Sequence, residues 1–247
     1  MLATGDPYRH ARITLGGIEP VVPTLLASRR IVLVACGTSH HACLTGRPLL
    51  ERFSGVPVAT ELASDFMDRR PPVFRGDSFV FLSQSGETAD TLAALRYARA
   101  RGALCVGVTN GVGSSLSRET DCGVHLNAGY EMGVASTKAY TSQIVVLAMI
   151  ALLLARDSIE KRAERDAIAD ALLSLPQAVR RALALDGAAR ALAARLQDVQ
   201  SLYVLGRGCD YASALEAALK VCMHPCLPIA SVREAYIGMG VLPKPHR

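Results

Sequence analysis

Residues 31–39 read IVLVACGTS and residues 79–88 read FVFLSQSGET. In each stretch a short apolar run gives way at once to small and hydroxyl-bearing residues. A continuous apolar run of this length is typical of a strand that is covered on both faces, as in a parallel sheet. The two stretches therefore predict buried parallel strands, each followed by a polar loop that leads into a helix.

The same alternation extends along the chain. Further strand-like runs occupy residues 56–59, 103–109 and 122–126, and helical patterns occupy residues 37–52, 87–101 and 136–156. Strict alternation of strand and helix predicts an α/β fold, a three-layer doubly wound parallel sheet with helices on both faces. The alternation begins again with a strand-like run at 202–205 and a helical pattern at 211–221, and then stops. Because one strand cannot form a sheet, we expect an incomplete second repeat there.

These patterns divide the chain of 247 residues into four segments. We expect residues 1–24 to be a linker and residues 25–156 to form the first domain. Residues 157–199, rich in Ala, Leu, Arg and Glu, predict a connector of two helices that break at Pro176. Residues 200–247 would be the start of the second domain, with a divergent tail.

Composition narrows the class of function. Hydrophobic residues make up 50% of the chain and charged residues 20%, which excludes a disordered protein. The net charge of +5 is not gathered into a basic stripe with aromatic residues, so we expect no nucleic-acid partner. The longest apolar stretch, residues 144–155, is shorter than the roughly 20 residues that span a bilayer. With no apolar signal segment at residues 1–17, we expect no membrane partner.

The seven cysteines are odd in number and lie mostly in apolar runs, where cysteine behaves as a small hydrophobic residue. This usage predicts a reducing compartment and a cytoplasmic protein. Cys222 and Cys226 flank His224, but no second pair of ligands accompanies them, so we expect no metal. We expect no other cofactor.

Polar loops at strand ends are candidate anion sites, because ligands of open parallel sheets bind beyond the carboxyl ends of the strands. A phosphate needs several donors in a small space, and the two loops supply them through Thr38, Ser39, Ser83, Gln84, Ser85 and Thr88. The nucleotide-binding patterns GxxxxGK[ST] and GxGxxG are absent from the sequence, which favours a phosphate that is not part of a nucleotide. The alternative is that these hydroxyls only cap the helices.

Five stretches carry a family resemblance: ACGTSHHA (35–42), ELASDFMDR (61–69), LSQSGETADTLAALRYA (82–98), VGSSLSRETDCGVHLNAG (112–129) and GVASTKAYTSQ (133–143). Together they resemble the isomerase half of glutamine:fructose-6-phosphate aminotransferases, which is built from two sugar isomerase (SIS) domains. The resemblance covers about residues 13–220. It implies an SIS fold, a homodimer, and a part in making glucosamine 6-phosphate from fructose 6-phosphate and glutamine in the hexosamine pathway to UDP-N-acetylglucosamine.

The resemblance also implies roles for single residues. Thr38 and Ser39 would contact the sugar, and the stretch from Ser83 to Thr88 would hold the phosphate of fructose 6-phosphate or glucosamine 6-phosphate through Ser83, Gln84, Ser85 and Thr88. Val134 and Ser136 would line the sugar pocket, whereas Lys138 would point to solvent.

In the second repeat, LGRGCDYASALEAALK (205–220) places Glu216 and Lys220 at family positions near the sugar. They are the catalytic candidates, with an ordinary charged helix face as the alternative. Arg207 is either a loop anchor or a ligand contact.

The chain departs from the family after Lys220. Met223 stands where the family has the glutamate that moves a proton between C1 and C2, and a thioether cannot be a general base. The family's downstream histidine motif, its carboxyl-terminal lysine and its glutaminase domain are not recognisable either. We therefore expect this chain to bind a sugar phosphate without turning it over. We expect the divergent tail after Lys220 to come from a different reading frame, an alternative exon or a gene model that ends early. The alternatives are a non-enzymatic sugar-phosphate sensor and an inert chain whose second lobe does not fold.

Overall fold

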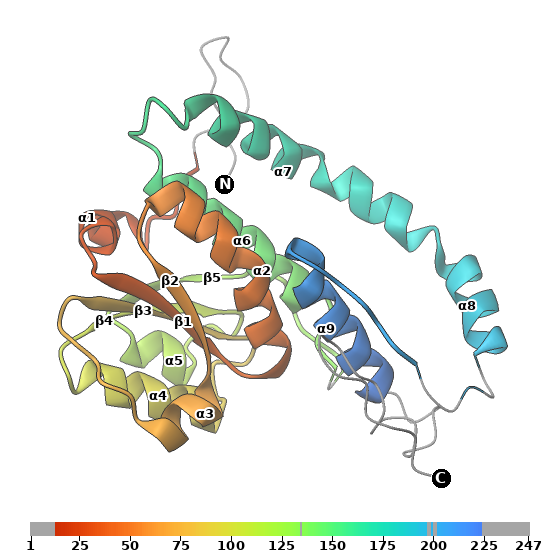
Figure 1. Ribbon diagram of the computed structural model, residues 1–247, viewed down its shortest axis with the longest axis horizontal. Coiled ribbons are helices and arrows are strands. Elements are labelled where there is room, and N and C mark those ends of the chain that lie inside the picture. The colour runs from red at the N-terminus through yellow and green to blue at the C-terminus, as the bar shows by residue number, and fades with distance from the viewer. Residues whose placement is uncertain (1–12, 134, 197–198, 200–201, 224–247) are drawn as a thin grey trace. The chain divides into compact units, whose positions relative to one another are not determined.

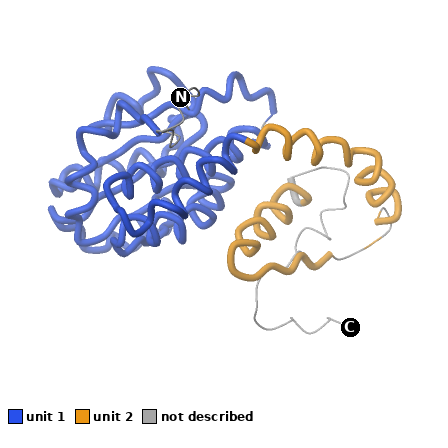
Figure 2. The backbone as a smooth tube through the Cα atoms, turned by 90° about the horizontal axis from the view of Figure 1, so that it is seen from above, with its two compact units in different colours: residues 1–173 blue, residues 174–247 orange. Residues whose placement is uncertain are grey.

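The structure is a computed structural model that describes residues 13–133, 135–196, 199 and 202–223 (Figure 1). The chain divides into two compact units, residues 1–173 and residues 174–247 (Figure 2). None of the described helices combines the length and the apolar character that crossing a bilayer requires.

The first unit is built on one parallel sheet. Its strands are β1 (Arg30–Ala35), β2 (Val58–Leu62), β3 (Asp77–Ser83), β4 (Leu104–Thr109) and β5 (Cys122–His125). Their order is β2-β1-β3-β4-β5, and every neighbouring pair is parallel, which confirms the predicted α/β fold. The chain leaves β1 toward one edge and returns to β3 on the other side. The carboxyl ends of β1 and β3 therefore flank a topological switch point, where doubly wound sheets bind ligands.

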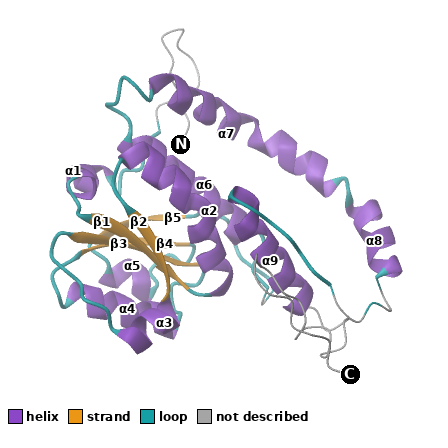
Figure 3. Cartoon of the chain, in the orientation of Figure 1, coloured by secondary structure: helices purple, strands orange, loops and turns teal. Residues whose placement is uncertain are grey.

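Helices cover both faces of the sheet, giving three layers (Figure 3). One face carries α1 (Val22–Leu26), α2 (Gly37–Ser54) and α6 (Lys138–Leu154), and the other carries α3 (Ala63–Arg69), α4 (Ala89–Arg99) and α5 (Ser115–Glu119). Side chains alternate between the faces of a strand. In β1, Ile31 and Leu33 pack into the first layer and Val32 and Val34 into the second.

A glycine brings α2 and α6 close together. A Cβ at Gly46 of α2 would lie 2.6 Å from Cδ1 and 2.8 Å from Cβ of Leu147 in α6. Only a residue without a side chain lets the two backbones approach this closely. This contact sets the position of α6 against the helix that follows β1.

Residues 13–24 correct the predicted linker. Ile13, Leu15, Ile18 and Val22 are buried in the core, and residues Glu19–Val21 form a 3₁₀ helix, η1, ahead of α1. The prolines lie in the first turns of η1 and α1, where a missing N–H group costs no helix hydrogen bond. The burial of its apolar side chains makes this segment part of the first unit rather than a linker.

The segment from 157 to 199 corrects a second prediction. Helix α7 (Arg162–Leu183) continues through Pro176, and α8 (Asp186–Arg195) begins only after residues 184 and 185. Pro176 is exposed, so water can solvate the carbonyl group that its missing N–H leaves free. The break therefore does not fall at the proline.

In the second unit, the predicted helix is confirmed as α9 (Cys209–Met223), but the predicted strand at 202–205 is not formed. A strand needs a hydrogen-bonded neighbour, and no strand in the described part of this unit provides one. Leu205 is 80% exposed. The domain start at 200–247 stays a prediction, because residues 200–201 and 224–247, with His224 and Cys226, lie outside the described residues.

Candidate functional site at the carboxyl edge of the sheet

The two predicted polar loops lie next to each other. The first follows β1 and the second follows β3, and these strands pair in parallel with Val34 opposite Phe81. Both loops therefore leave the sheet at the same edge, on either side of the switch point (Figure 1). Thr91 of α4 links them, because its Oγ1 donates to Sγ of Cys36 at 3.7 Å.

The first loop opens helix α2. Cys36 is the extended residue before the helix, and Gly37 follows with a φ of 51°, a left-handed conformation that suits glycine. Thr38 and Ser39 lie in the first turn, where backbone N–H groups have no partner within the helix. Thr38 is half-buried and Ser39 is buried, with Oγ of Ser39 accepting a hydrogen bond from Nε2 of Gln143 at 2.8 Å. This turn presents the positive end of an 18-residue helix.

The second loop is a tight turn with internal hydrogen bonds. The backbone N–H of Gly86 donates to Oγ of Ser83 at 3.0 Å, and that of Glu87 donates to Oγ of Ser85 at 3.1 Å. Oγ of Ser83 also lies 3.2 Å from Oγ1 of Thr88. Ser83 is buried, Gln84 and Thr88 are half-buried and Ser85 is exposed.

The capping alternative fails at Thr88. Thr88 is the residue before α4, yet its side chain accepts no hydrogen bond from the first turn of that helix. The first N–H groups of α4 thus have neither a helical partner nor this hydroxyl as a cap. They remain available for an anion at the start of an 11-residue helix.

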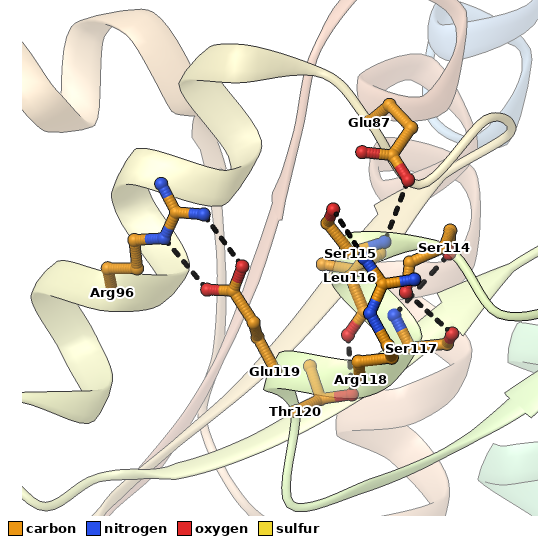
Figure 4. Close-up of polar contacts among 9 residues, drawn as sticks. All are labelled: Glu87, Arg96, Ser114, Ser115, Leu116, Ser117, Arg118, Glu119 and Thr120. Atoms are coloured by element: carbon orange, nitrogen blue, oxygen red, sulfur yellow. Dashed lines mark hydrogen bonds and ion pairs between the residues drawn. The ribbon is translucent and has the colours of Figure 1, made fainter.

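A third segment, residues 109–116, is a clamp that holds the second loop in place through hydrogen bonds, and Figure 4 shows the one between Ser115 and Glu87. The carbonyl oxygen of Gln84 accepts from the N–H groups of residues 110 and 111 at 3.1 and 3.2 Å, and that of Gly86 accepts from Leu116 at 3.0 Å. The carboxylate of Glu87 accepts from the N–H of Ser115 at 2.8 Å. Sequence analysis missed this clamp. The signal for it was weak, because only the polar pattern around 114–119 marks the short helix α5.

The same segment also stabilises the charged form of Glu87. The backbone N–H and hydroxyl of Ser115 hold the pKa of Glu87 below its ordinary value, with a smaller contribution from Arg118. Nearby, Arg96 of α4 donates from Nε to the carboxylate of Glu119 in α5 at 2.8 Å (Figure 4). These contacts join α4 and α5 beneath the loop.

Gly86 fits the clamp only because it lacks a side chain. A Cβ at this position would lie 2.1 Å from Oγ of Ser114 and 2.8 Å from Oγ1 of Thr109. Its φ of 71° is also in the left-handed region. The glycine of the SQSGET motif is therefore required by both conformation and space.

The segment before α6 is held by Glu131. Its carboxylate accepts from Oγ of Ser136 at 3.4 Å and from the N–H of Ala139 at 3.1 Å, so it caps the start of α6. Lys138 is exposed, as predicted, while Val134 lies outside the described residues. The contact between Gln143 and Ser39 brings the beginning of α6 to the first turn of α2.

The first turn of α2 carries no strong positive charge. Burial, followed by the repulsion of His41, lowers the pKa of His40, so its ring is mainly neutral at pH 7. Within the described residues, no three His, Cys, Asp or Glu side chains are grouped to hold a metal ion. At the carboxyl edge of the sheet, an anion would therefore be bound mainly by hydroxyl groups, backbone N–H groups and the positive ends of helices.

The predicted catalytic candidates lie in the second unit. Nζ of Lys220 is 2.6 Å from Oε1 of Glu216, one turn apart on α9. Glu216 is only 6% exposed and the side chain of Lys220 is 24% exposed, and both the catalytic role and the alternative of an ordinary charged helix face stay open. Arg207 lies in the exposed loop before α9, and its two roles stay open.

Comparison with known proteins agrees with this arrangement. The chain is 56% identical over 220 residues to isomerizing glutamine–fructose-6-phosphate aminotransferase 1 of Arabidopsis thaliana, and 53% identical over 209 residues to aminotransferase 2 of Homo sapiens. These alignments cover 89% and 85% of this chain. The chain spans 32% and 31% of the length of those relatives, about a third.

A solved structure and a family model match as well. The C-terminal domain of glucosamine-fructose-6-phosphate aminotransferase from Francisella tularensis superposes with a TM-score of 0.77 at 36% identity, covering 82% of this chain and 58% of that one. The family model of the SIS domain matches residues 24–153, which include all five strands and both polar loops. The chain thus belongs to the SIS-domain family.

Proposed function

We propose that this chain binds a sugar phosphate, fructose 6-phosphate or glucosamine 6-phosphate, at the carboxyl edge of its sheet. In this role it is the isomerase part of a glutamine:fructose-6-phosphate aminotransferase, the activity named for its relatives. The observation that carries the proposal is the pair of hydroxyl-bearing loops on either side of the β1/β3 switch point.

The phosphate would sit against the second loop. Ser85 and Gln84 expose donors there, Ser83 and Thr88 pair with each other behind them, and the start of α4 adds free N–H groups. Hydrogen bonds to an ionised acceptor are roughly twice as strong as neutral ones. Because residues 109–116 hold the loop in place, little conformational entropy is lost when the anion binds.

The sugar would contact the first loop and the segment before α6. Thr38 and Ser39 face this edge from α2, and Ser136 lies just before α6. Val134 belongs to the same proposed pocket. Glu216 and Lys220 of the second unit are catalytic candidates by the family resemblance alone, and they form a short ion pair with each other.

We further propose that the chain alone binds its ligand without turning it over. Met223 occupies the position where the family resemblance requires a carboxylate, and a thioether takes up no proton. An assay of glucosamine 6-phosphate formation from fructose 6-phosphate and ammonia tests this directly. Product at a rate above the blank reaction would contradict it.

Binding itself is tested by isothermal titration calorimetry with fructose 6-phosphate, using fructose and inorganic phosphate as controls. We expect fructose 6-phosphate to bind saturably, and we expect fructose and inorganic phosphate each to bind more weakly. Ser85→Ala should weaken binding about tenfold, the cost of one hydrogen bond to a charged group. The matched control is Ser174→Ala, an exposed serine on α7. No heat with the unsubstituted chain, or undiminished affinity in Ser85→Ala, would refute the site.

We also propose a cytoplasmic, homodimeric protein. Cys43 and Cys105 are buried free thiols, which suits a reducing compartment. The dimer rests on the family resemblance. Light scattering after size-exclusion chromatography tests it, and a monomer mass at micromolar concentration would contradict it. The absence of nucleic-acid and membrane partners remains a prediction.

A further inference from the structure

Gln143 makes a buried, long-range contact with a proposed ligand residue. Its amide Nε2 donates to Oγ of Ser39 at 2.8 Å, across 104 positions of sequence. Gln143 is 1% exposed and Ser39 is 8% exposed, so water competes little with this bond. It joins the second turn of α6 to the first turn of α2.

This bond decides how the Ser39 hydroxyl can act. A serine hydroxyl carries one hydrogen and can accept two hydrogen bonds. Because Gln143 supplies the hydrogen, Oγ of Ser39 acts as acceptor in this contact and keeps its own hydrogen. Among the described residues this is the one hydrogen bond of the Ser39 side chain, so its hydrogen is available to a ligand.

The other polar atom of the Gln143 amide, Oε1, has a different environment. Oε1 of Gln143 is buried and has no hydrogen-bond partner in the part of the chain that the structure describes. With the amide reversed, Oε1 would take the Ser39 hydrogen, and a ligand would meet only lone pairs. The orientation in which Ser39 remains a donor suits the sugar that this loop would contact, because the carbonyl or ring oxygen of a sugar can accept a hydrogen bond but cannot donate one.

We infer that Gln143 is a positioning residue that keeps Ser39 a hydrogen-bond donor toward the sugar of the bound sugar phosphate. The inference rests on the proposed function, since it concerns the same edge. Gln143 itself touches no ligand in this scheme, and its effect passes through Ser39. The same contact holds the beginning of α6 at the site.

A double-mutant cycle tests the inference in the 247-residue chain. Calorimetry would measure the Kd of fructose 6-phosphate for the unsubstituted chain, Gln143→Met, Ser39→Ala and the double variant. Methionine matches glutamine in length but donates nothing. We expect Gln143→Met to weaken binding about five- to tenfold in the unsubstituted background and less than about twofold in the Ser39→Ala background.

The pH dependence of ligand binding by Gln143→Glu gives a second test. If Gln143 only supported the fold, this substitution would not change how the Kd depends on pH. A carboxylate can only accept, so it would take the Ser39 hydrogen and repel the anion, whereas a protonated carboxyl could donate as the amide does. We expect the unsubstituted chain to bind more tightly as pH rises through the phosphate pKa of about 6. Gln143→Glu should bind more tightly as pH falls. Gln177→Glu, an exposed change of equal charge on α7, should follow the unsubstituted chain.

The outcomes are distinct. Equal losses from Gln143→Met in both backgrounds, or no loss in either, would overturn the inference while leaving the proposed function intact. If the unsubstituted chain binds no hexose phosphate, the proposed function fails and the inference fails with it. Should Gln143→Glu not fold, as judged by circular dichroism, the methionine cycle decides alone.

Discussion

Replacing Gly86 by alanine tests whether the second loop is shaped by its clamp. The added Cβ would lie 2.1 Å from Oγ of Ser114 and 2.8 Å from Oγ1 of Thr109, well inside van der Waals contact. The backbone φ of 71° adds a second penalty. A left-handed conformation costs an L-residue roughly 1–2 kcal/mol, and overpacking typically costs about 1–3 kcal/mol more. We therefore expect the free energy of unfolding to fall by about 2–5 kcal/mol.

Gly113 provides the matched control. Its φ of 70° is nearly the same, but a Cβ there would meet nothing within 4 Å. Gly113→Ala should therefore lose only the conformational part, about 1–2 kcal/mol. The difference between the two variants isolates the steric contact with the clamp.

Urea unfolding followed by circular dichroism measures both losses, and calorimetry with fructose 6-phosphate measures the effect on the site. We expect Gly86→Ala to bind at least about tenfold more weakly, because the loop must move away from residues 109–116, whereas Gly113→Ala should bind normally. If both variants lose the same stability, or if Gly86→Ala keeps its affinity, the close fit between loop and clamp is not what shapes the site.

Three further predictions concern charge and packing. Hydrogen bonds from Ser115 lower the pKa of Glu87 below its ordinary value of 4.5, so the stability that this carboxylate contributes should be complete above pH 4.5 and be lost as pH falls through the lowered pKa. The melting temperature of the unsubstituted chain should therefore exceed that of Glu87→Gln at pH 6. A difference in melting temperature that persists at pH 2 would contradict this prediction. Gly46→Ala should cost about 1–3 kcal/mol in urea unfolding because its Cβ would strike Leu147, and an unchanged midpoint would show that the helices can separate freely. Asp77→Ala should cost about 3 kcal/mol, since it removes the carboxylate 2.9 Å from Nη2 of Arg30, and a loss under about 1 kcal/mol would mean that the pair is dispensable.

Much of the first unit could be predicted because its signals are local. The apolar runs at 31–35 and 79–82 form β1 and β3, and the polar residues after them open the loops. A strand buried on both faces needs an unbroken apolar run, which is visible in a short window of sequence. The same reasoning located β4 and β5 within a residue of their bounds.

The predictions that were wrong concern segments whose structure depends on tertiary contacts or on solvent exposure rather than on the local sequence. A linker was expected at 1–24, but Ile13, Leu15, Ile18 and Val22 are buried in the core. A break was expected at Pro176, but this proline lies on an exposed face of α7, where the helix continues. The run at 202–205 is apolar enough for a strand and yet finds no partner within the described residues. The short helices α3 and α5 carry too few residues for a visible period.

The sequence alone determined the alternation of strands and helices and the two hydroxyl-bearing loops, because each depends on residues adjacent in the chain. Only the tertiary structure decided that these loops flank a switch point, since strand order is a property of pairing between distant segments. The same holds for the clamp on Gly86 and for the bond from Gln143 to Ser39. Hydrogen bonds of this kind join residues that come close only after the sheet has formed, so no short window of sequence contains them.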